Sequence, residues 1–114
     1  MFMNTSLQAL ADPSRRRIVE LLLARELPVG ELVEALPIAQ SGVSRHLRIL
    51  REAGMVRCRA EGQRRLYALQ PEPFAELSDW LAEVRRHWDH SLDRFEMALA
   101  QRQSPTPPET KDET

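Results

Sequence analysis

Residues 41–54 read SGVSRHLRILREAG and carry three arginines and a histidine among apolar residues. The apolar residues recur at steps of three and four and predict a helix with one buried face: Val43, Leu47, Ile49, Leu50 and Ala53. Gln40 or Ser41 can cap the start of this helix, and Gly54 is a natural stop. The apolar stripe explains why one face of the helix is buried, but it does not show what the basic face contacts.

Three helical segments precede this one. Residues 4–11 form a short helix, and Asp12 with Pro13 then marks the start of a second, since aspartate is a good N-cap and proline suits the first helical turn. Pro28 ends that helix, and residues 29–36 predict a short third helix with its valines and leucines inward. The basic helix is therefore the fourth of a series.

The periodicity changes after Gly54. In MVRCRA, residues 55–60, apolar residues alternate with arginine, as in a half-exposed strand. Gly62 marks a turn, and RRLYAL, residues 64–69, is the returning strand. Together these segments predict a β-hairpin with a basic tip, in which Glu61 is the one acid.

A long helix is predicted from about Phe74 to about Gln101, after Pro71 and Pro73. About 27 residues at 1.5 Å each give roughly 40 Å, which is longer than a domain of this size covers by itself. The apolar stripes of the first and last helices predict a homodimer interface with these members: Leu7, Leu10, Leu77, Leu81, Val84, Trp88, Leu92, Phe95 and Leu99. The alternative is that the last helix closes over the core of its own domain.

The organisation of the chain is simple. Its 114 residues suffice for one domain, assigned to residues 1–101, and the polar, proline-rich residues 102–114 predict a disordered tail. Cys58 is the single cysteine, so no disulfide forms within the chain. There is no signal-peptide pattern and no apolar run long enough to span a bilayer, so we expect a cytoplasmic protein without a membrane partner.

Charge is distributed unevenly along the chain, although the net charge is only −1. Residues 13–65 hold 11 arginines against six glutamates, a net charge of +5. Residues 66–101 hold seven acids against three arginines, a net charge of −4. This asymmetry predicts an anionic partner for the first half alone, and nucleic acid is such a partner.

The order of helices, basic hairpin and closing helix is that of a winged helix-turn-helix, a mainly α fold with a β-hairpin wing. The chain also resembles the ArsR/SmtB family of bacterial repressors over residues 5–99, in the segments LADPSRRRIVELL, GELVEAL, SGVSRHLRILREAGMV and GQRRLYAL. The resemblance implies a homodimeric repressor that binds double-stranded DNA with its fourth helix in the major groove. It also implies that in many members a ligand, often a metal ion, releases the DNA.

Short polar side chains at the start of the fourth helix suit major-groove readout, because they let the backbone approach the base edges. The predicted base-reading residues are Gln40, Ser41, Ser44 and Arg45. Gly42 adds no side-chain bulk there, and Arg48 and Arg51, one and two turns later, are predicted to contact phosphates. For His46 two interpretations stand, a phosphate contact or packing between helices.

The hairpin arginines suit phosphate or minor-groove contact from a wing: Arg57, Arg59, Arg64 and Arg65. Alternatively, their charge protects the edge of a soluble hairpin from pairing with another strand. The run Arg15, Arg16 and Arg17 opposes the dipole at the start of the second helix, which suggests a use without defining it.

Metal sensing is the alternative that the resemblance raises. One family site places two cysteines near the third helix, and the matching positions here hold Pro28 and Gly30, which offer no ligand side chain. A second site lies on the last helix, where His87 and His90 have the spacing of one ligand pair, but the upstream pair is incomplete because Phe74 occupies it. We therefore expect a metal-independent member without a cofactor, with a repressor that responds to metal through His87 and His90 as the alternative. The sequence does not specify an effector.

Two further functions compete with DNA binding. A winged-helix module that binds protein instead of DNA would present an acidic or apolar face on residues 40–51, and this face is basic. An enzyme is not expected, since the chain has no nucleophile–base pair, no phosphate-binding glycine loop and no complete metal set. The sequence therefore favours a DNA-binding transcriptional regulator.

Overall fold

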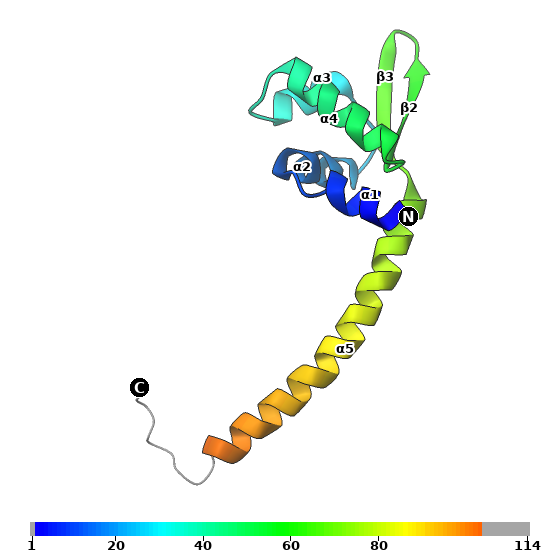
Figure 1. Cartoon of the computed structure of the whole chain (residues 1–114). Coiled ribbons are helices and arrows are strands. Elements are labelled where there is room, and N and C mark those ends of the chain that lie inside the picture. The colour runs from blue at the N-terminus through cyan, green and yellow to red at the C-terminus, as the bar shows by residue number, and fades with distance from the viewer. Residues whose placement is uncertain (1, 104–114) are drawn as a thin grey trace. The chain divides into compact units, whose positions relative to one another are not determined.

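The computed structural model describes residues 2–103 and divides the chain into two units, one up to Leu77 and one from Ser78 onward. Within the described residues the chain forms five helices and three strands (Figure 1): α1 (Phe2–Ala9), α2 (Pro13–Leu22), β1 (Leu27–Pro28), α3 (Val29–Ala35), α4 (Gln40–Glu52), β2 (Val56–Glu61), β3 (Arg64–Leu69) and α5 (Pro71–Gln103). The order matches the predicted helices and hairpin with one strand added, and α1 lies two residues ahead of the predicted range 4–11.

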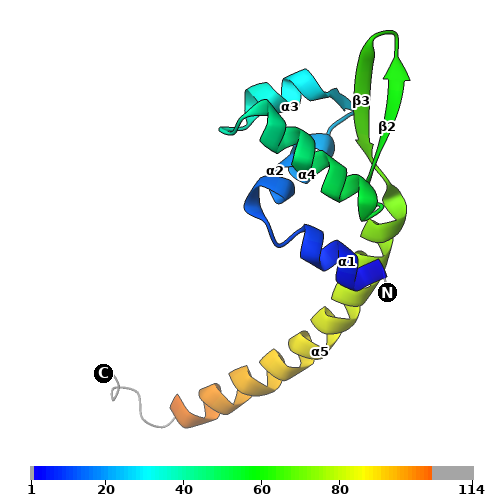
Figure 2. The same ribbon diagram turned by 45° about the horizontal axis from the view of Figure 1, so that its top comes forward.

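Helix α4 packs on both α2 and α3 in the first unit (Figure 2). Its buried side chains belong to the predicted apolar stripe, with Val43, Leu47 and Leu50 almost fully buried. Ile18 of α2 and Leu32 of α3 join them in one apolar cluster. This stripe therefore anchors α4 against two helices and leaves its opposite face to solvent.

Asp12 caps α2 as predicted. Its Oδ1 accepts hydrogen bonds from the backbone N–H of Ser14 at 2.8 Å and of Arg15 at 3.2 Å, and Pro13 occupies the first turn. Slight burial acts to raise the pKa of Asp12, but the backbone hydrogen bonds of Arg15 and Ser14 and the nearby charges of His46 and Arg15 hold that pKa below its usual range. The cap is therefore complete above the usual carboxyl pKa and is lost only as the pH falls through the lowered value.

Replacing Asp12 with alanine is expected to lower the free energy of unfolding by about 1 kcal/mol, as is typical when an N-cap side chain is removed. Urea denaturation at neutral pH measures the change. The matched control is Asp12→Asn, which keeps a capping oxygen and should retain most of the stability. Equal destabilisation by both substitutions would contradict the capping role.

The sheet contains a strand that the sequence interpretation missed. Leu27 and Pro28 form β1 and pair antiparallel with Tyr67 and Leu66 of β3, so the strand order is β1-β3-β2. Two residues, one of them proline, carry no alternating pattern from which a strand could be predicted. The hairpin of β2 and β3 is confirmed, with a turn at Gly62, whose φ is +63°.

Two helix starts differ from the prediction. The N-cap residue of α4 is Ala39, and no side chain caps the helix, so Gln40 and Ser41 lie inside it rather than at its cap. Helix α5 begins at Pro71 instead of Phe74, because both prolines of this segment lie in its first turn. Backbone N–H groups in the first turn of a helix have no helical partner, so proline, which lacks an N–H, is well tolerated there.

Helix α5 has 33 residues and spans roughly 50 Å at 1.5 Å per residue. Leu77 in its first turns is only 7% exposed and belongs to the apolar cluster of the first unit, so it fills the core of its own subunit rather than an exposed dimer face. The tail predicted for residues 102–114 lies, from residue 104 on, outside the described residues. None of the helices in residues 2–103 is long and apolar enough to cross a membrane.

Candidate nucleic-acid interface

One face of α4 is polar and open to solvent. Six of the residues predicted to contact DNA are exposed on this helix: Gln40, Ser41, Ser44, Arg45, Arg48 and Arg51. They lie away from the buried Val43, Leu47 and Leu50, as the helical period requires. The exposed face offers amide, hydroxyl and guanidinium groups, and these are the groups that bind base edges and phosphates.

Gly42 does not contribute to this face in the way that the sequence suggested. A Cβ added at Gly42 would lie 3.6 Å from Cδ1 of Ile38, which is an ordinary van der Waals distance. The glycine therefore faces Ile38, two residues before the helix begins. Its small size is not what allows a partner to approach α4.

His46 lies on the buried side of α4. The residue is 7% exposed, and its Nδ1 lies 3.2 Å from Nη1 of Arg15 in α2. Its Nε2 lies 4.0 Å from Oδ1 of Asp12. Of the two interpretations, these contacts match packing between helices, so we leave His46 out of the DNA-facing set.

The arginine run at the start of α2 binds the end of α1. Nε of Arg15 donates to the carbonyl oxygen of Ala9 at 2.6 Å, and Nη1 of Arg16 donates to that of Leu10 at 2.8 Å. Carbonyl groups at a helix C-terminus carry partial negative charge, so the two cations stabilise them. This role was not predicted from the sequence, although a basic run directly after a predicted helix end was its signal.

Two of the four hairpin arginines are each held by two hydrogen bonds within the protein. Arg59 forms a bidentate ion pair with Glu26, with distances of 2.8 Å from Nη2 and 3.0 Å from Nε to the carboxylate oxygens. This hydrogen bonding holds the pKa of Glu26 below its usual range. Arg57 donates to the carbonyl oxygen of Leu69 at 3.0 Å and to Oε1 of Gln70 at 3.2 Å. These two arginines therefore hold the hairpin in place.

The other two arginines lie near the hairpin tip. Arg64 and Arg65 are exposed; Arg64 pairs with Glu61 at 3.2 Å, and Nη1 of Arg65 lies 3.8 Å from Sγ of Cys58. Both line an open surface hollow of about 580 Å³ that Ser44 of α4 lines as well, together with Pro28 of β1 and residues of α3 that include Glu31 and Glu34. The structure thus brings the exposed face of α4 and the hairpin tip to one concave surface.

The second unit consists of α5 from Ser78 onward and exposes large apolar side chains: Trp80, Leu81, Trp88, Leu92, Phe95 and Met97. Trp88 and Phe95 are 57% and 60% exposed, and Val84 and Leu99 are half-buried. In the first unit, Leu7 is exposed and Leu10 is half-buried against the core. An exposed apolar stripe of this extent marks an interaction face.

The two histidines of α5 are exposed. The ring of His87 meets the ring of Trp88 edge to face, with centroids 6.4 Å apart, and His90 lies one turn later. Among residues 2–103 no group of three or more histidine, cysteine, aspartate or glutamate side chains is placed to hold a metal ion. His87 and His90 are therefore not part of a larger ligand set within the described part of one chain.

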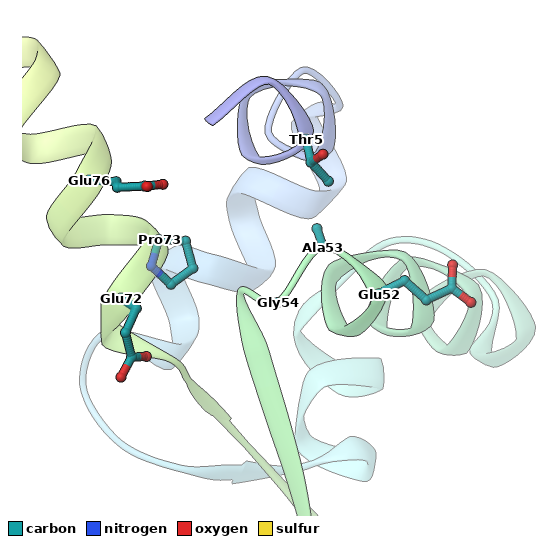
Figure 3. A pocket seen from close by; sticks show the side chains of 7 residues that line it. All are labelled: Thr5, Glu52, Ala53, Gly54, Glu72, Pro73 and Glu76. Atoms are coloured by element: carbon teal, nitrogen blue, oxygen red, sulfur yellow. The ribbon is translucent and has the colours of Figure 1, made fainter. Parts of the chain in front are cut away.

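A second hollow, of about 540 Å³, lies where α1, the end of α4 and the start of α5 meet (Figure 3). Thr5 of α1 and Pro73 of α5 line it, as do three carboxylates from two helices, Glu52, Glu72 and Glu76. None of its lining residues is cationic. Because carboxylates repel phosphates, this hollow is not part of the nucleic-acid interface.

Comparisons with known proteins agree with the geometry of α4 and the hairpin. The family described as bacterial regulatory protein, arsR family, matches residues 12–57. The chain is 44% identical over 88 residues to the HTH-type transcriptional regulator Rv2034 of Mycobacterium tuberculosis, which covers 77% of this chain and 79% of that protein. It is 29% identical over 90 residues to the transcriptional repressor SdpR of Bacillus subtilis, which covers 79% of this chain and 100% of that protein.

The fold agrees as well. A crystal structure of an ArsR family transcriptional regulator matches with a TM-score of 0.70 at 32% identity and covers 78% of this chain and 98% of that chain. The five helices and the hairpin sheet of this chain match the winged helix-turn-helix fold of such structures. The chain therefore belongs to the ArsR family and is a winged helix-turn-helix transcriptional regulator that binds DNA.

Proposed function

We propose that this regulator is a homodimeric repressor that binds a twofold-symmetric promoter site on double-stranded DNA in the cytoplasm. The observation that carries the proposal is the concave surface shared by Ser44 of α4 and by Arg64 and Arg65 of the hairpin. A helix in the major groove reads bases while a basic wing beside it holds the backbone. The Bacillus subtilis relative is named a transcriptional repressor, and the proposal of repression follows that name.

The exposed residues of α4 fall into two groups, according to whether their position on the helix suits contact with bases or with phosphates. Those at its start approach the base edges: Gln40, Ser41, Ser44 and Arg45. Within this set, Arg45 suits bidentate pairing with guanine and Gln40 suits adenine. Arg48 and Arg51, one and two turns further along the helix, contact phosphates.

The hairpin acts as the wing, with Arg64 and Arg65 as its phosphate contacts. Arg57 and Arg59 support the wing, because each is held by two hydrogen bonds to groups of the chain, whereas Arg64 and Arg65 each make one contact, at 3.2 and 3.8 Å. This assignment narrows the wing contacts expected from the sequence from four arginines to two.

The exposed stripe of α5 pairs with the same stripe of a second copy. Its proposed members are Leu81, Val84, Trp88, Leu92, Phe95 and Leu99. In the first unit, Leu7 and Leu10 of α1 are the proposed interface residues. Pairing removes apolar surface from water, and a twofold dimer matches a twofold-symmetric site.

The proposed repressor does not depend on a metal ion and is not an enzyme. The positions of a cysteine site near α3 hold Pro28 and Gly30, whose side chains cannot bind a metal. On α5, His87 and His90 form one pair without its upstream partners. A response to zinc through His87 and His90 would therefore contradict the proposal that the repressor is metal-independent.

Selection of bound fragments from genomic DNA tests the proposed function. The purified protein is expected to enrich a small set of promoter fragments that share a twofold-symmetric sequence. Repeating the selection with zinc is expected to leave the set unchanged. Zinc-sensitive release that is lost in His87→Ala would overturn the metal-independent assignment, and absence of any enriched fragment would overturn sequence-specific binding.

Replacing Arg64 and Arg65 with alanine is expected to weaken binding to every DNA sequence alike, because phosphates carry no base identity. The slope of log affinity against log salt concentration should decrease by about two, about one for each lost phosphate contact. Salt titrations on the selected site and on a scrambled duplex measure both effects. A loss confined to the selected site would contradict the phosphate assignment.

A further inference from the structure

Two carbonyl groups at the end of α1 lack the donors that a continuing helix would supply. In an α-helix the carbonyl oxygen of residue i accepts a hydrogen bond from the N–H of residue i+4. For Ala9 that residue is Pro13, which has no N–H. For Leu10 it is Ser14, whose N–H donates instead to Oδ1 of Asp12 at 2.8 Å. Both carbonyl groups therefore depend on donors from elsewhere in the chain.

Arg15 and Arg16 supply these donors from the start of α2. Nε of Arg15 donates to the carbonyl oxygen of Ala9 at 2.6 Å. Nη1 of Arg16 donates to the carbonyl oxygen of Leu10 at 2.8 Å. Hydrogen bonds from a charged donor are stronger than those between neutral groups. The two side chains therefore fix the end of α1 against α2.

The same end of α1 carries the residues proposed for the dimer contact in the first unit. Leu7 is 41% exposed, and Leu10 is half-buried. The backbone that would present Leu10 to a second copy is the backbone to which Arg16 donates. Any movement of this turn against α2 would therefore move the dimer contact with it.

Helix α2 also holds α4. Ile18 of α2 lies in one apolar cluster with Val43 and Leu47 of α4, and all three side chains are at most 1% exposed. In addition, Nη1 of Arg15 lies 3.2 Å from Nδ1 of His46, on the buried side of α4. Helix α2 therefore contacts both α1 and α4 and determines how these two helices lie relative to each other within the first unit.

We propose that Arg15 and Arg16 are positioning residues that fix the dimer contact of α1 relative to α4, and so determine which spacing of two half-sites the dimer accepts. The inference rests on the proposed function, in which each copy places its α4 in the major groove of a twofold-symmetric site. The distance between the two copies of α4 then depends on the path from α4 through α2 and α1 to the partner. Because the carbonyl groups of Ala9 and Leu10 lack helical donors, the arginine bonds keep this path rigid at the end of α1.

Half-site spacing distinguishes this role from a general effect on folding. One base pair inserted between the half-sites moves them about 3.4 Å apart and turns them by about 34°, since about 10.5 base pairs make one turn of about 35 Å. A dimer with rigidly placed α4 helices cannot follow this change, so it loses the gain of binding both half-sites together. A dimer whose α1 is loosely held loses less on insertion. Partial unfolding, in contrast, would lower binding to every site by the same factor.

The variants Arg15→Met and Arg16→Met test the proposal, because methionine keeps an unbranched side chain that suits a helix but offers no donor. Fluorescence anisotropy at constant salt measures affinity for three duplexes: the selected site, the same site with one inserted base pair, and a single half-site. The wild type is expected to bind the selected site at least about tenfold more tightly than the inserted site.

Each variant should bind the selected site about tenfold less tightly than the wild type, a factor within the usual range for coupled sites. Its affinities for the inserted site and for the single half-site should equal those of the wild type, because the face of α4 is unchanged. The penalty for the inserted base pair should therefore disappear. Sedimentation equilibrium should still give a dimeric mass.

The matched control is Arg17→Met. Arg17 is the next residue of the same run, is exposed, and pairs with Glu20 of α2 at 3.3 Å. The control variant therefore loses the same charge without losing a bond to α1, and it should keep the wild-type affinities for all three duplexes. Arg16 is exposed whereas Arg15 is half-buried, so Arg16→Met tests the proposal even if Arg15→Met fails to fold.

Several results would overturn the positioning role alone. They are a wild type that tolerates the inserted base pair, a variant with equal losses on the half-site and the selected site, a variant that keeps the wild-type penalty, and a monomeric variant. The same changes in Arg17→Met would also overturn it, because loss of charge would then explain them. A wild type that is monomeric, or that binds no twofold-symmetric site, would overturn the proposed function and this inference with it.

Discussion

Replacing both Ser44 and Arg45 with alanine is expected to abolish the preference of the protein for its selected site over unrelated DNA. A bidentate arginine–guanine pair discriminates by about 1 to 3 kcal/mol, so losing Arg45 alone should reduce specific affinity about ten- to hundredfold. The phosphate contacts of the wing remain, so weak general binding should persist. The ratio of dissociation constants for the selected and scrambled duplexes measures the effect.

A charge-matched control separates base reading from general electrostatics. Arg17 of α2 is exposed and pairs with Glu20 at 3.3 Å, so Arg17→Ala removes one positive charge without touching α4. Its ratio of dissociation constants should equal that of the wild type. Retention of the wild-type ratio by the variant of Ser44 and Arg45 would show that another element reads the bases.

Replacing both Leu81 and Trp88 with glutamate is expected to convert the protein into a monomer. These side chains are 54% and 57% exposed on α5, and the proposed dimer would bury them. Paired copies would then place carboxylates against carboxylates in an apolar contact, which is strongly unfavourable. Sedimentation equilibrium should give half the wild-type mass, and affinity for the twofold site should fall at least about a hundredfold because the two half-sites are no longer bound together.

The matched control lies on the polar side of the same helix. Arg86 is exposed and lies away from the apolar stripe, so Arg86→Glu alters charge without entering the contact. It should remain a dimer. A dimeric mass for the variant of Leu81 and Trp88 would show that the copies associate through another surface.

Most elements of the first unit could be predicted because their signals are local. The stripe of Val43, Leu47 and Leu50 has the helical period, and Asp12 with Pro13 provides a start within two residues. Gly54 adopts φ of +77°, a conformation that favours glycine, and it ends α4 as predicted. Signals of this kind depend only on residues close together in the sequence, so they can be recognised without knowledge of the tertiary structure.

Contacts between distant residues could not be predicted in the same way. The ion pair of Glu26 with Arg59 joins positions 33 apart, and the contact of Arg15 with His46 joins positions 31 apart. The contact with Arg15 accompanies the burial of His46, and the ion pair with Glu26 engages Arg59 within the protein. Composition alone therefore overestimated the number of residues available to DNA, because it could not show which cations have partners inside the fold.

The short strand β1 has a consequence for the order in which the first unit assembles. Pairing of Leu27 with Tyr67 closes a chain loop of about forty residues that contains α3, α4 and the first strand of the hairpin. The hairpin itself closes over a short turn, so its contacts form at a much smaller loss of chain entropy. We therefore expect β1 to pair with β3 only after β2 and β3 have formed the hairpin, and this pairing closes the part of the chain that holds α3 and α4.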